Sequence, residues 1–166
     1  MITIICVDTQ DEGNLGAIAR LMQNFGVTNL RMVNTGHAPG KPTIDHLSQT
    51  ALDRASHAQQ LLKDAKSFTT VKEAVSGFDY VLGTTALVGD DYNLKRTPFT
   101  PKEIAPKIKE VMGSGDKNIA LMMGREDHGL SNDELALCDV TITIPANKKD
   151  PVLNLSHACG IILYEL

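Results

Sequence analysis

The chain has 166 residues, of which 42% are hydrophobic and 22% charged, and this is the composition of one ordinary globular domain. No apolar run reaches the roughly 18 residues that a membrane span needs, and the start of the chain lacks the basic region of a signal peptide, so we expect a single cytoplasmic domain over residues 1–166. A net charge of −4 and an aromatic content of 4% count against a broad nucleic-acid surface, so any RNA site must be a local basic patch or depend on a partner.

Short apolar runs alternate with helical patterns along the chain. The spacing of Leu15, Ile18 and Met22 predicts an amphipathic helix that ends at Gly26. This alternation predicts an α/β fold with a mostly parallel sheet and helices on both faces. We expect strands over residues 2–7, 30–33, 80–82, 119–123 and 140–144.

Three further features complete the predicted organisation. Thr100 and Ser131 each begin a capping box, which predicts a helix start at both positions. Residues 86–98 have no clear periodicity, as expected of a functional or disordered loop. Residues 155–166 are apolar on most of their circumference, which indicates a helix buried in the core or against a partner subunit.

The cysteines and histidines indicate neither disulfides nor a metal site. Cys6, Cys138 and Cys159 are odd in number and far apart, so we expect reduced thiols. The five histidines have no metal-ligand spacing. We therefore expect no metal.

The first candidate site follows the first predicted strand. Gly16 and Arg20 are four residues apart and share a helix face, where the glycine would leave space beside the arginine side chain. Arg20 lies off the apolar stripe, and its permanently charged fork suits a phosphate or a carboxylate. Asn14 also fits a plain N-cap, and Arg20 a solvated surface residue, so this segment alone leaves both interpretations open.

The second candidate site follows the strand predicted over residues 119–123. Gly124 and Gly129 permit a sharp turn and the close approach of a ligand. No G-x-x-x-x-G-K-[ST] loop is present, and Asp133 and Glu134 at the next helix start would repel a pyrophosphate. A cofactor without phosphate, such as S-adenosylmethionine, fits better. The alternative is a structural turn before a capped helix.

The third candidate site covers residues 144–157 and runs from a strand, through a proline-bounded loop, into the last helix. Asn154 and Ser156 are small polar residues that suit a helix N-terminus. Capping would explain one of them. Both together, followed by an apolar helix, suggest a polar site at the edge of a buried interface, although capping alone stays open.

Together, in this order and spacing, the three segments resemble the three motifs of the SPOUT methyltransferases, in the SpoU branch. The resemblance covers nearly the whole chain. A further region around Gly83-Thr84-Thr85-Ala86 and Arg96-Thr97-Pro98 is similar to the TrmJ subgroup, which methylates tRNA. The matching motifs are Asn14-x-Gly16-x-x-x-Arg20, Gly124-x-Glu126-x-x-Gly129-Leu130-Ser131, and Ile144-Pro145 followed by Leu153-Asn154-x-Ser156.

This resemblance implies a fold, an assembly and a cofactor. The C-terminal segment would thread a loop to make a deep trefoil knot, and two copies would form a homodimer. The cofactor would be S-adenosylmethionine, with S-adenosylhomocysteine as product and no metal. Carried over by position, the cofactor-binding residues are Thr84, Thr85, Ala86, Gly124, Ile144, Pro151, Val152 and Leu153.

The implied reaction is methyl transfer to a ribose 2′-hydroxyl of RNA, at nucleotide 32 of the tRNA anticodon loop in the TrmJ subgroup. We assign Arg20, acting across the dimer, to orienting the ribose and its phosphate, because a guanidinium with a pKa above about 12 cannot accept the proton. The other candidate catalytic residues are Asn14, Glu126, Asn154 and Ser156. Besides Arg20, the candidate RNA-binding residues are Lys95, Arg96, Lys148 and Lys149.

The chain departs from the family pattern at one position. Many members have Ser-Leu-Asn in the third motif, whereas this chain has Val152-Leu153-Asn154, which removes a hydroxyl contact and leaves a backbone contact possible. Several other functions stay open: methylation of ribosomal RNA or of another tRNA position, a catalytically inactive RNA-binding dimer, or an α/β enzyme for a small nucleotide or metabolite. The acidic charge favours the last of these, and the missing phosphate loop opposes it.

Overall fold

The structure, a computed structural model, describes residues 1–35, 44–86 and 98–166. Within these residues, six parallel strands form one sheet in the order β3-β2-β1-β5-β4-β6, which confirms the predicted α/β class with a parallel sheet. The strands are β1 (Ile2–Val7), β2 (Asn29–Val33), β3 (Lys66–Phe68), β4 (Tyr80–Thr84), β5 (Ile119–Met123) and β6 (Val140–Ile142).

The sequence predicted five of these strands and missed β3. That strand has three residues and pairs only with β2, at the edge of the sheet. Lys66 and Ser67 are exposed, so the apolar signal of a buried parallel strand is absent. Three boundaries also differ, since β2 begins at Asn29, β4 continues to Thr84 and β6 ends at Ile142.

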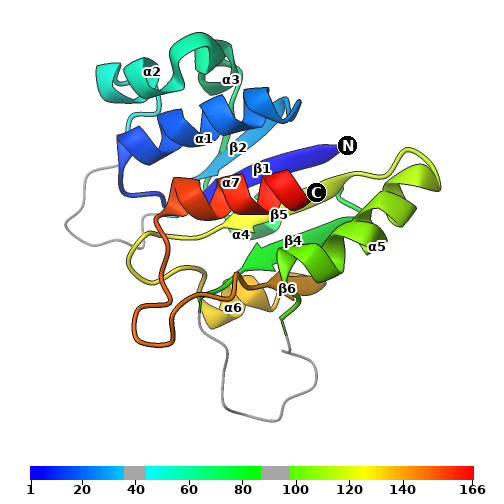
Figure 1. Cartoon of the computed structure of the whole chain (residues 1–166). Helices are drawn as coiled ribbons and strands as arrows, with labels where there is room; N and C mark the ends of the chain where they lie inside the picture. The colour runs from blue at the N-terminus through cyan, green and yellow to red at the C-terminus, as the bar shows by residue number, and fades with distance from the viewer. Residues whose placement is uncertain (36–43, 87–97) are drawn as a thin grey trace.

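Helices cover both faces of the sheet, as predicted. On the face toward the viewer in Figure 1 lie α1, α5 and α7, while α4 and α6 pack against the other face. The helices are α1 (Glu12–Asn24), α2 (Gln49–Ala55), α3 (Gln59–Lys63), α4 (Val71–Ala74), α5 (Pro101–Gly113), α6 (Asn132–Leu135) and α7 (Leu155–Glu165), with a short 3-10 helix, η1 (Ser56–Ala58), between α2 and α3.

Alternating side chains of the central strands supply two separate cores. In β1, Ile4 and Cys6 belong to the core shared with α1, α5 and α7, whereas Ile5 and Val7 belong to the core shared with α4. All four are fully buried, as expected of a strand that is covered on both faces. The two central strands therefore hold rigid positions for the loops that follow them.

The local signals at helix ends agree with the structure. Thr100 and Ser131 each form a capping box, with Glu103 and Glu134 returning the hydrogen bond. Gly26 has a φ of +73° directly after the end of α1, a conformation that favours glycine. The predicted irregular loop over residues 86–98 lies mostly outside the described residues.

The strand order reverses direction between β1 and β5. β1 pairs with β2 on one side and with β5 on the other, so the loops that leave the carboxyl ends of β1 and β5 start side by side. In open α/β sheets, ligands bind in the crevice at such a point. The motif around Gly124 lies in the loop after β5, and the motif around Asn14 begins in the first turn of α1, just beyond the loop after β1.

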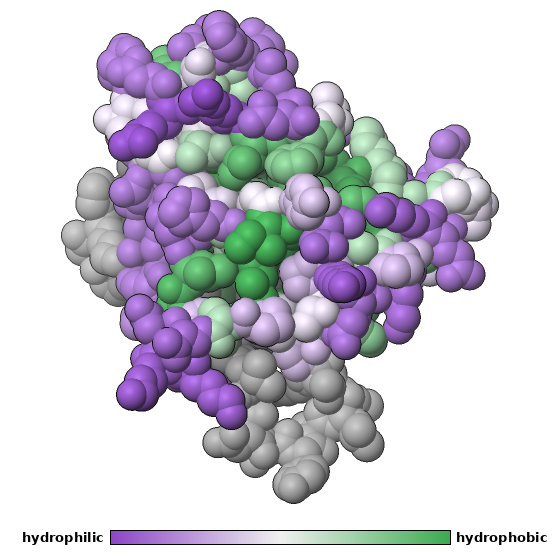
Figure 2. Space-filling model, in the orientation of Figure 1, coloured by the Kyte–Doolittle hydropathy of each residue, from purple (hydrophilic) through white to green (hydrophobic). Residues whose placement is uncertain are grey.

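An apolar area lies on the surface formed by α1 and α7. Figure 2 shows hydrophobic side chains gathered in the middle of this face, over α7 and the adjoining part of α1. Phe25, Ile161 and Tyr164 are 42%, 41% and 75% exposed. Gly160 allows close packing of the two helices, because an added Cβ would lie 3.3 Å from Leu21.

Candidate active site at the carboxyl edge of the sheet

The carboxylate of Glu126, two residues beyond Gly124, ties the loop after β5 to the loop after β1. It accepts hydrogen bonds from the backbone N–H groups of Gln10 and Asp11, at 2.8 and 3.2 Å. The side-chain amide of Asn14, in the first turn of α1, donates a third hydrogen bond at 2.9 Å. Two distant motifs therefore meet at one carboxylate.

The third motif joins them through two asparagines. Asn154 donates from its side-chain amide to Oδ1 of Asn14 at 3.0 Å. Its own Oδ1 accepts from the backbone N–H and the hydroxyl of Ser156, at 3.0 and 2.7 Å, so it also caps α7. Four predicted catalytic residues thus form one connected cluster, the amide network: Glu126, Asn14, Asn154 and Ser156.

Arg20 is not part of this network. It is exposed on α1 and makes no hydrogen bond or ion pair within the described part of the chain. From Asn14 it is six positions farther along the helix, about 9 Å along the axis and about 120° around it. A role for Arg20 in its own protomer's network is therefore not supported by the geometry, and its role in trans stays a prediction.

The predicted reason for Gly16 is wrong. Gly16 does not leave space beside Arg20, because a Cβ there would lie 2.2 Å from the carbonyl oxygen of Ala51 and 2.7 Å from Cβ of Arg54. The glycine instead lets α2 pack directly on α1. Such packing between two helices far apart in sequence cannot be read from helical spacing.

The Gly124 backbone is closed in by its own loop. Arg125 and Gly129 exchange backbone hydrogen bonds of 3.2 and 3.0 Å, which fold the loop back over Gly124. A Cβ on Gly124 would lie 2.3 Å from the backbone of Gly129 and Leu130. Gly124 is therefore required by the turn, whether or not a ligand also approaches its backbone.

The other predicted cofactor residues come from three neighbouring strands. Thr84 ends β4 and donates from its hydroxyl to the carbonyl of Met122 in β5, at 3.0 Å. The Thr85 N–H donates to the carbonyl of Ile142 in β6, at 2.9 Å. Because β4 lies between β5 and β6, the ends of these strands adjoin at one edge of the sheet.

Apolar side chains remain partly exposed at this edge. Ile144 and Leu153 are half-buried and Val152 is 52% exposed, which suits the apolar part of a small ligand. Ala86 and Pro151 are also half-buried.

A second cluster, which the sequence did not predict, lies beside the first. The Arg125 guanidinium forms a bidentate pair with Glu134, both bonds being 2.9 Å, and contacts Asp8 at 2.6 Å. Side-chain exposures of 13% for Arg125, 10% for Glu134 and 7% for Asp8 make this a nearly buried group, the ion triad. Arg125 is 117 residues from Asp8 and nine residues from Glu134 in the sequence, and neither separation matches a known sequence pattern.

The pairing of Glu134 with Arg125 favours the charged forms of both side chains. Burial alone would raise the pKa of Glu134, but hydrogen bonds from Arg125 and Ser131 outweigh it and hold that pKa below its ordinary value. The hydrogen bond with Glu134 likewise raises the pKa of Arg125. An arginine paired in this way is not available to bind a phosphate.

A hollow of about 600 Å³ opens beside the ion triad. Its lining includes Thr70, Lys72 and Leu137, together with Arg125 and Ser131. The Thr70 and Ser131 hydroxyls already cap α4 and α6. Lys72, His128 and Asp133 also line the hollow and are exposed, so it combines charges of both signs.

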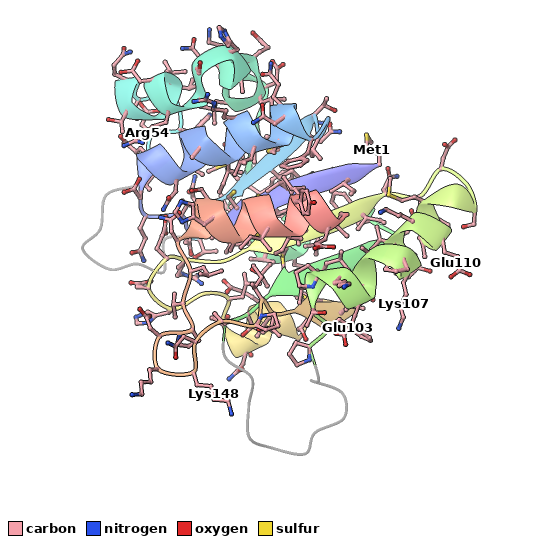
Figure 3. The ribbon with its side chains drawn as sticks, in the orientation of Figure 1. Met1, Arg54, Glu103, Lys107, Glu110 and Lys148 are labelled. Atoms are coloured by element: carbon pink, nitrogen blue, oxygen red, sulfur yellow. The ribbon has the colours of Figure 1, made fainter. Side chains whose placement is uncertain are left out.

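The candidate RNA-binding lysines lie at a loop tip. Lys148 and Lys149 are exposed, and Figure 3 shows Lys148 directed away from the body of the protein. The turn is closed by a hydrogen bond from the N–H of Asp150 to the carbonyl of Asn147, at 3.0 Å. Lys95 and Arg96 lie outside the described residues.

The three thiols are free, and two of them are fully buried. Cys6 and Cys159 are fully buried, and burial raises the pKa of both, that of Cys159 to about 12. Burial also raises the pKa of Cys138 to about 12.

Across residues 1–35, 44–86 and 98–166, no cluster of His, Cys, Asp and Glu has the arrangement of a metal site. In the same residues, no helix is long and apolar enough to cross a membrane.

A family model described as the SpoU rRNA Methylase family matches residues 1–164. A tRNA (cytidine-2'-O-)-methyltransferase TrmJ of Methanocaldococcus jannaschii is 45% identical over 166 residues, which are 100% of this chain and 67% of that protein. A tRNA (cytidine/uridine-2'-O-)-methyltransferase TrmJ of Salmonella typhimurium is 35% identical over 165 residues, which are 99% of this chain and 63% of that protein.

A solved structure has a similar fold. The crystal structure of TrmJ from Z. mobilis ZM4 superposes with a TM-score of 0.81 at 33% identity, covering 99% of this chain and 68% of that one. The chain thus spans about two thirds of the length of the relatives that it matches.

Proposed function

The chain belongs to the SpoU rRNA methylase family, and from that premise we propose that it transfers a methyl group from S-adenosylmethionine to a ribose 2′-hydroxyl of tRNA. The names of its TrmJ relatives support tRNA as the substrate class. We place the target at nucleotide 32 of the anticodon loop, following the resemblance to the TrmJ subgroup, and the enzyme in the cytoplasm. Residues 1–166 would act as one methyltransferase domain.

One observation carries this proposal: three motifs far apart in sequence join in the amide network at the switch point of the sheet. Asn14 and Asn154 are 140 residues apart and are hydrogen bonded to each other. Capping of α7 needs only the Oδ1 atom of Asn154, so its bond to Asn14 has no purpose in capping. A site that must hold three loops in register explains that bond.

The carboxyl ends of β4, β5 and β6 would hold the cofactor. Its pocket comprises Thr84, Thr85, Ala86, Gly124, Ile144, Pro151, Val152 and Leu153. When bound, S-adenosylmethionine supplies the electrophilic methyl group. The half-buried side chains of Ile144 and Leu153 would cover its apolar parts, and the absence of cations among the pocket's side chains suits a positively charged sulfonium.

The residues of the chain would act mainly by positioning. The 2′-oxygen must align with the methyl group, form the new O–CH₃ bond and lose its proton. Arg20 of one protomer would orient the ribose and its phosphate at the partner's network, and the proton would pass to a phosphate oxygen or to water. Asn14, Glu126, Asn154 and Ser156 would set the shape of that site. Lys148, Lys149, Lys95 and Arg96 would contact RNA phosphates.

We propose that two copies associate through α1 and α7. The exposed apolar side chains Phe25, Ile161 and Tyr164 support this face, as does the position of Arg20 on α1, outside its own network. Exchange of Ile161 for Glu should convert a dimer into a monomer in analytical ultracentrifugation. We also propose that the C-terminal segment forms the family's trefoil knot. The observation that supports it is the path of the chain after β6: this strand lies at one edge of the sheet, yet the helix that follows it, α7, packs on α1.

Mapping of 2′-O-methylated nucleotides tests the function. Total tRNA incubated with the protein and S-adenosylmethionine should gain a 2′-O-methyl group at nucleotide 32, and free nucleosides should gain none. Methylation of another tRNA nucleotide, or of ribosomal RNA alone, would overturn the assigned target. Cofactor binding without methylation of any RNA would overturn the enzymatic proposal.

A further inference from the structure

We propose that the ion triad of Asp8, Arg125 and Glu134 is a positioning unit that sets Glu126, and through it Asn14, for methyl transfer. This inference rests on the proposed function, because it assigns a role to residues that support the same site. None of the three would touch RNA or cofactor. They act through the backbone of the loop after β5.

Both terminal nitrogens of the Arg125 guanidinium are hydrogen bonded to the protein. Nη1 donates to Glu134 at 2.9 Å and to the carbonyl of Gly129 at 3.3 Å. Nη2 donates to Glu134 at 2.9 Å and to Asp8 at 2.6 Å. These four bonds occupy both terminal nitrogens of the fork, so a substrate phosphate could not form a bidentate pair with them without displacing a protein partner.

Asp8 contributes a strained backbone. Its φ is +44°, in the left-handed region that a non-glycine residue rarely adopts. Thr35 holds the carboxylate through its backbone N–H at 2.7 Å and its hydroxyl at 2.5 Å, and Arg125 holds it from the other side. Strain of this kind persists where the surroundings over-determine it, and such residues cluster at functional sites.

Arg125 and Glu126 are consecutive and connect opposite faces of the sheet. Arg125 pairs with Glu134 in α6, which packs on one face, whereas Glu126 bonds Asn14 in α1, on the other face. Both also hold the segment that follows β1, through Asp8 and through Gln10 with Asp11. A displacement of Arg125 is therefore transmitted directly to the carboxylate of Glu126.

Burying three charges is expensive, and apolar side chains of similar volume would often be as stable. Stability alone is thus a weak reason for the ion triad. Positional precision is a stronger one, because an error of about 1 Å at a catalytic group can lower a rate about 100-fold. The bidentate geometry of arginine and carboxylate limits both the distance and the orientation of the loop.

A double-mutant cycle between Arg125→Ala and Glu126→Ala tests the proposal. Arg125→Ala should lower kcat for tRNA methylation about 10- to 100-fold, with a much smaller change in KM for the cofactor. In the Glu126→Ala background, Arg125→Ala should lower kcat no further, because the carboxylate that Arg125 positions has already been removed. Equal loss of kcat in both backgrounds, or an unchanged kcat in a folded Arg125→Ala protein, would overturn the proposal.

Conservative variants keep the test decisive if Arg125→Ala does not fold. Arg125→Lys keeps a charge but not the fork, and Glu134→Gln keeps the shape but not the charge. Each should lower kcat less than Arg125→Ala and still show no further effect after Glu126→Ala. Lys117→Ala is the matched control, because it removes an exposed pair with Asp79 at the amino edge, and its kcat should equal that of the wild type.

Amide hydrogen exchange separates this inference from the proposed function. The N–H groups of Gln10 and Asp11 are bonded to Glu126, so Arg125→Lys and Glu134→Gln should accelerate their exchange whatever reaction the protein catalyses. A wild type that fails to methylate tRNA would end the proposed function while faster exchange supports the coupling. Unchanged exchange together with unchanged kcat would end the coupling while leaving the methyltransferase intact.

Discussion

Two polar clusters start from neighbouring residues of one loop, yet they are built from different chemistry. The ion triad around Arg125 consists of charged groups with side-chain exposures of 13% or less. The amide network around Glu126 contains one carboxylate, two asparagines and a serine, and one of its asparagines, Asn154, is exposed. The difference suggests that the ion triad fixes the loop, while the amide network faces the reaction.

Removal of Glu134 should give the largest loss of stability. Glu134→Ala leaves Arg125 nearly buried without its bidentate partner, which typically costs about 3 kcal/mol or more in the free energy of unfolding. Urea denaturation measures this change. Lys117→Ala, which breaks an exposed pair with Asp79, should have a far smaller effect. Equal losses in the two variants would contradict the structural role of the ion triad.

Removal of Arg20 should affect catalysis alone. Arg20→Ala should lower kcat at least about 100-fold, or about 2.7 kcal/mol in the barrier, the scale expected when one hydrogen bond to the transition state is removed. Because Arg20 is exposed and bonded to neither cluster, the melting temperature should not change. Steady-state kinetics and calorimetry measure both quantities. Near-normal turnover would remove Arg20 from the mechanism.

Asn14→Ala should affect both stability and catalysis. The variant leaves Glu126 and Asn154 each without one partner, which typically costs about 1.5 kcal/mol in the free energy of unfolding. We expect kcat to fall about tenfold because the side chain that joins the three loops is removed. A variant that loses stability but keeps its kcat would assign the amide network to folding alone.

Strong acid should weaken the ion triad. The folded-state pKa of Glu134 is held below its ordinary value of 4.5, so its contribution is present above about pH 4.5 and is lost as pH falls through the lower folded-state value. The difference in unfolding free energy between the wild type and Glu134→Gln should therefore shrink below about pH 4.5. Urea titrations from pH 6 to about pH 3 measure it. A constant difference would contradict the assignment.

The loop lysines should have the smallest effect. Lys148→Ala with Lys149→Ala should weaken tRNA binding and reduce the dependence of log K on log salt by roughly 0.7 to 0.9 for each phosphate that is no longer neutralised. Stability should be unchanged because both side chains are exposed. Lys63→Ala, in α3, serves as a control with no expected effect on binding. An unaltered salt slope would remove these lysines from the RNA site.

Local and periodic features of the fold could be read from the sequence. The apolar runs of β1 and β5, the capping boxes at Thr100 and Ser131, and the stop at Gly26 depend on residues close together in the chain. The short edge strand Lys66–Phe68 could not be read, because it has little to bury. The role of Gly16 in packing α2 on α1 was also hidden, since it depends on tertiary packing.

The candidate site also has a part that the sequence predicted and a part that it did not. The convergence of Asn14, Glu126 and Asn154 was expected only because their motifs together resemble a known family. Arg125 stood inside one of those motifs without a predicted partner. Its pairs with Asp8 and Glu134 form only when the fold brings the loop after β1, the loop after β5 and the start of α6 together, and no spacing in the sequence predicts them.

Titration of S-adenosylmethionine into the wild-type protein by isothermal calorimetry tests the central claim most directly. That claim is that the carboxyl ends of β4, β5 and β6, beside the amide network that joins the segments after β1, β5 and β6, form one site for a sulfonium methyl donor. The account predicts saturable binding of one molecule per chain, with S-adenosylhomocysteine competing for the same site. A folded protein that gives no binding heat for either compound up to millimolar concentration would contradict it.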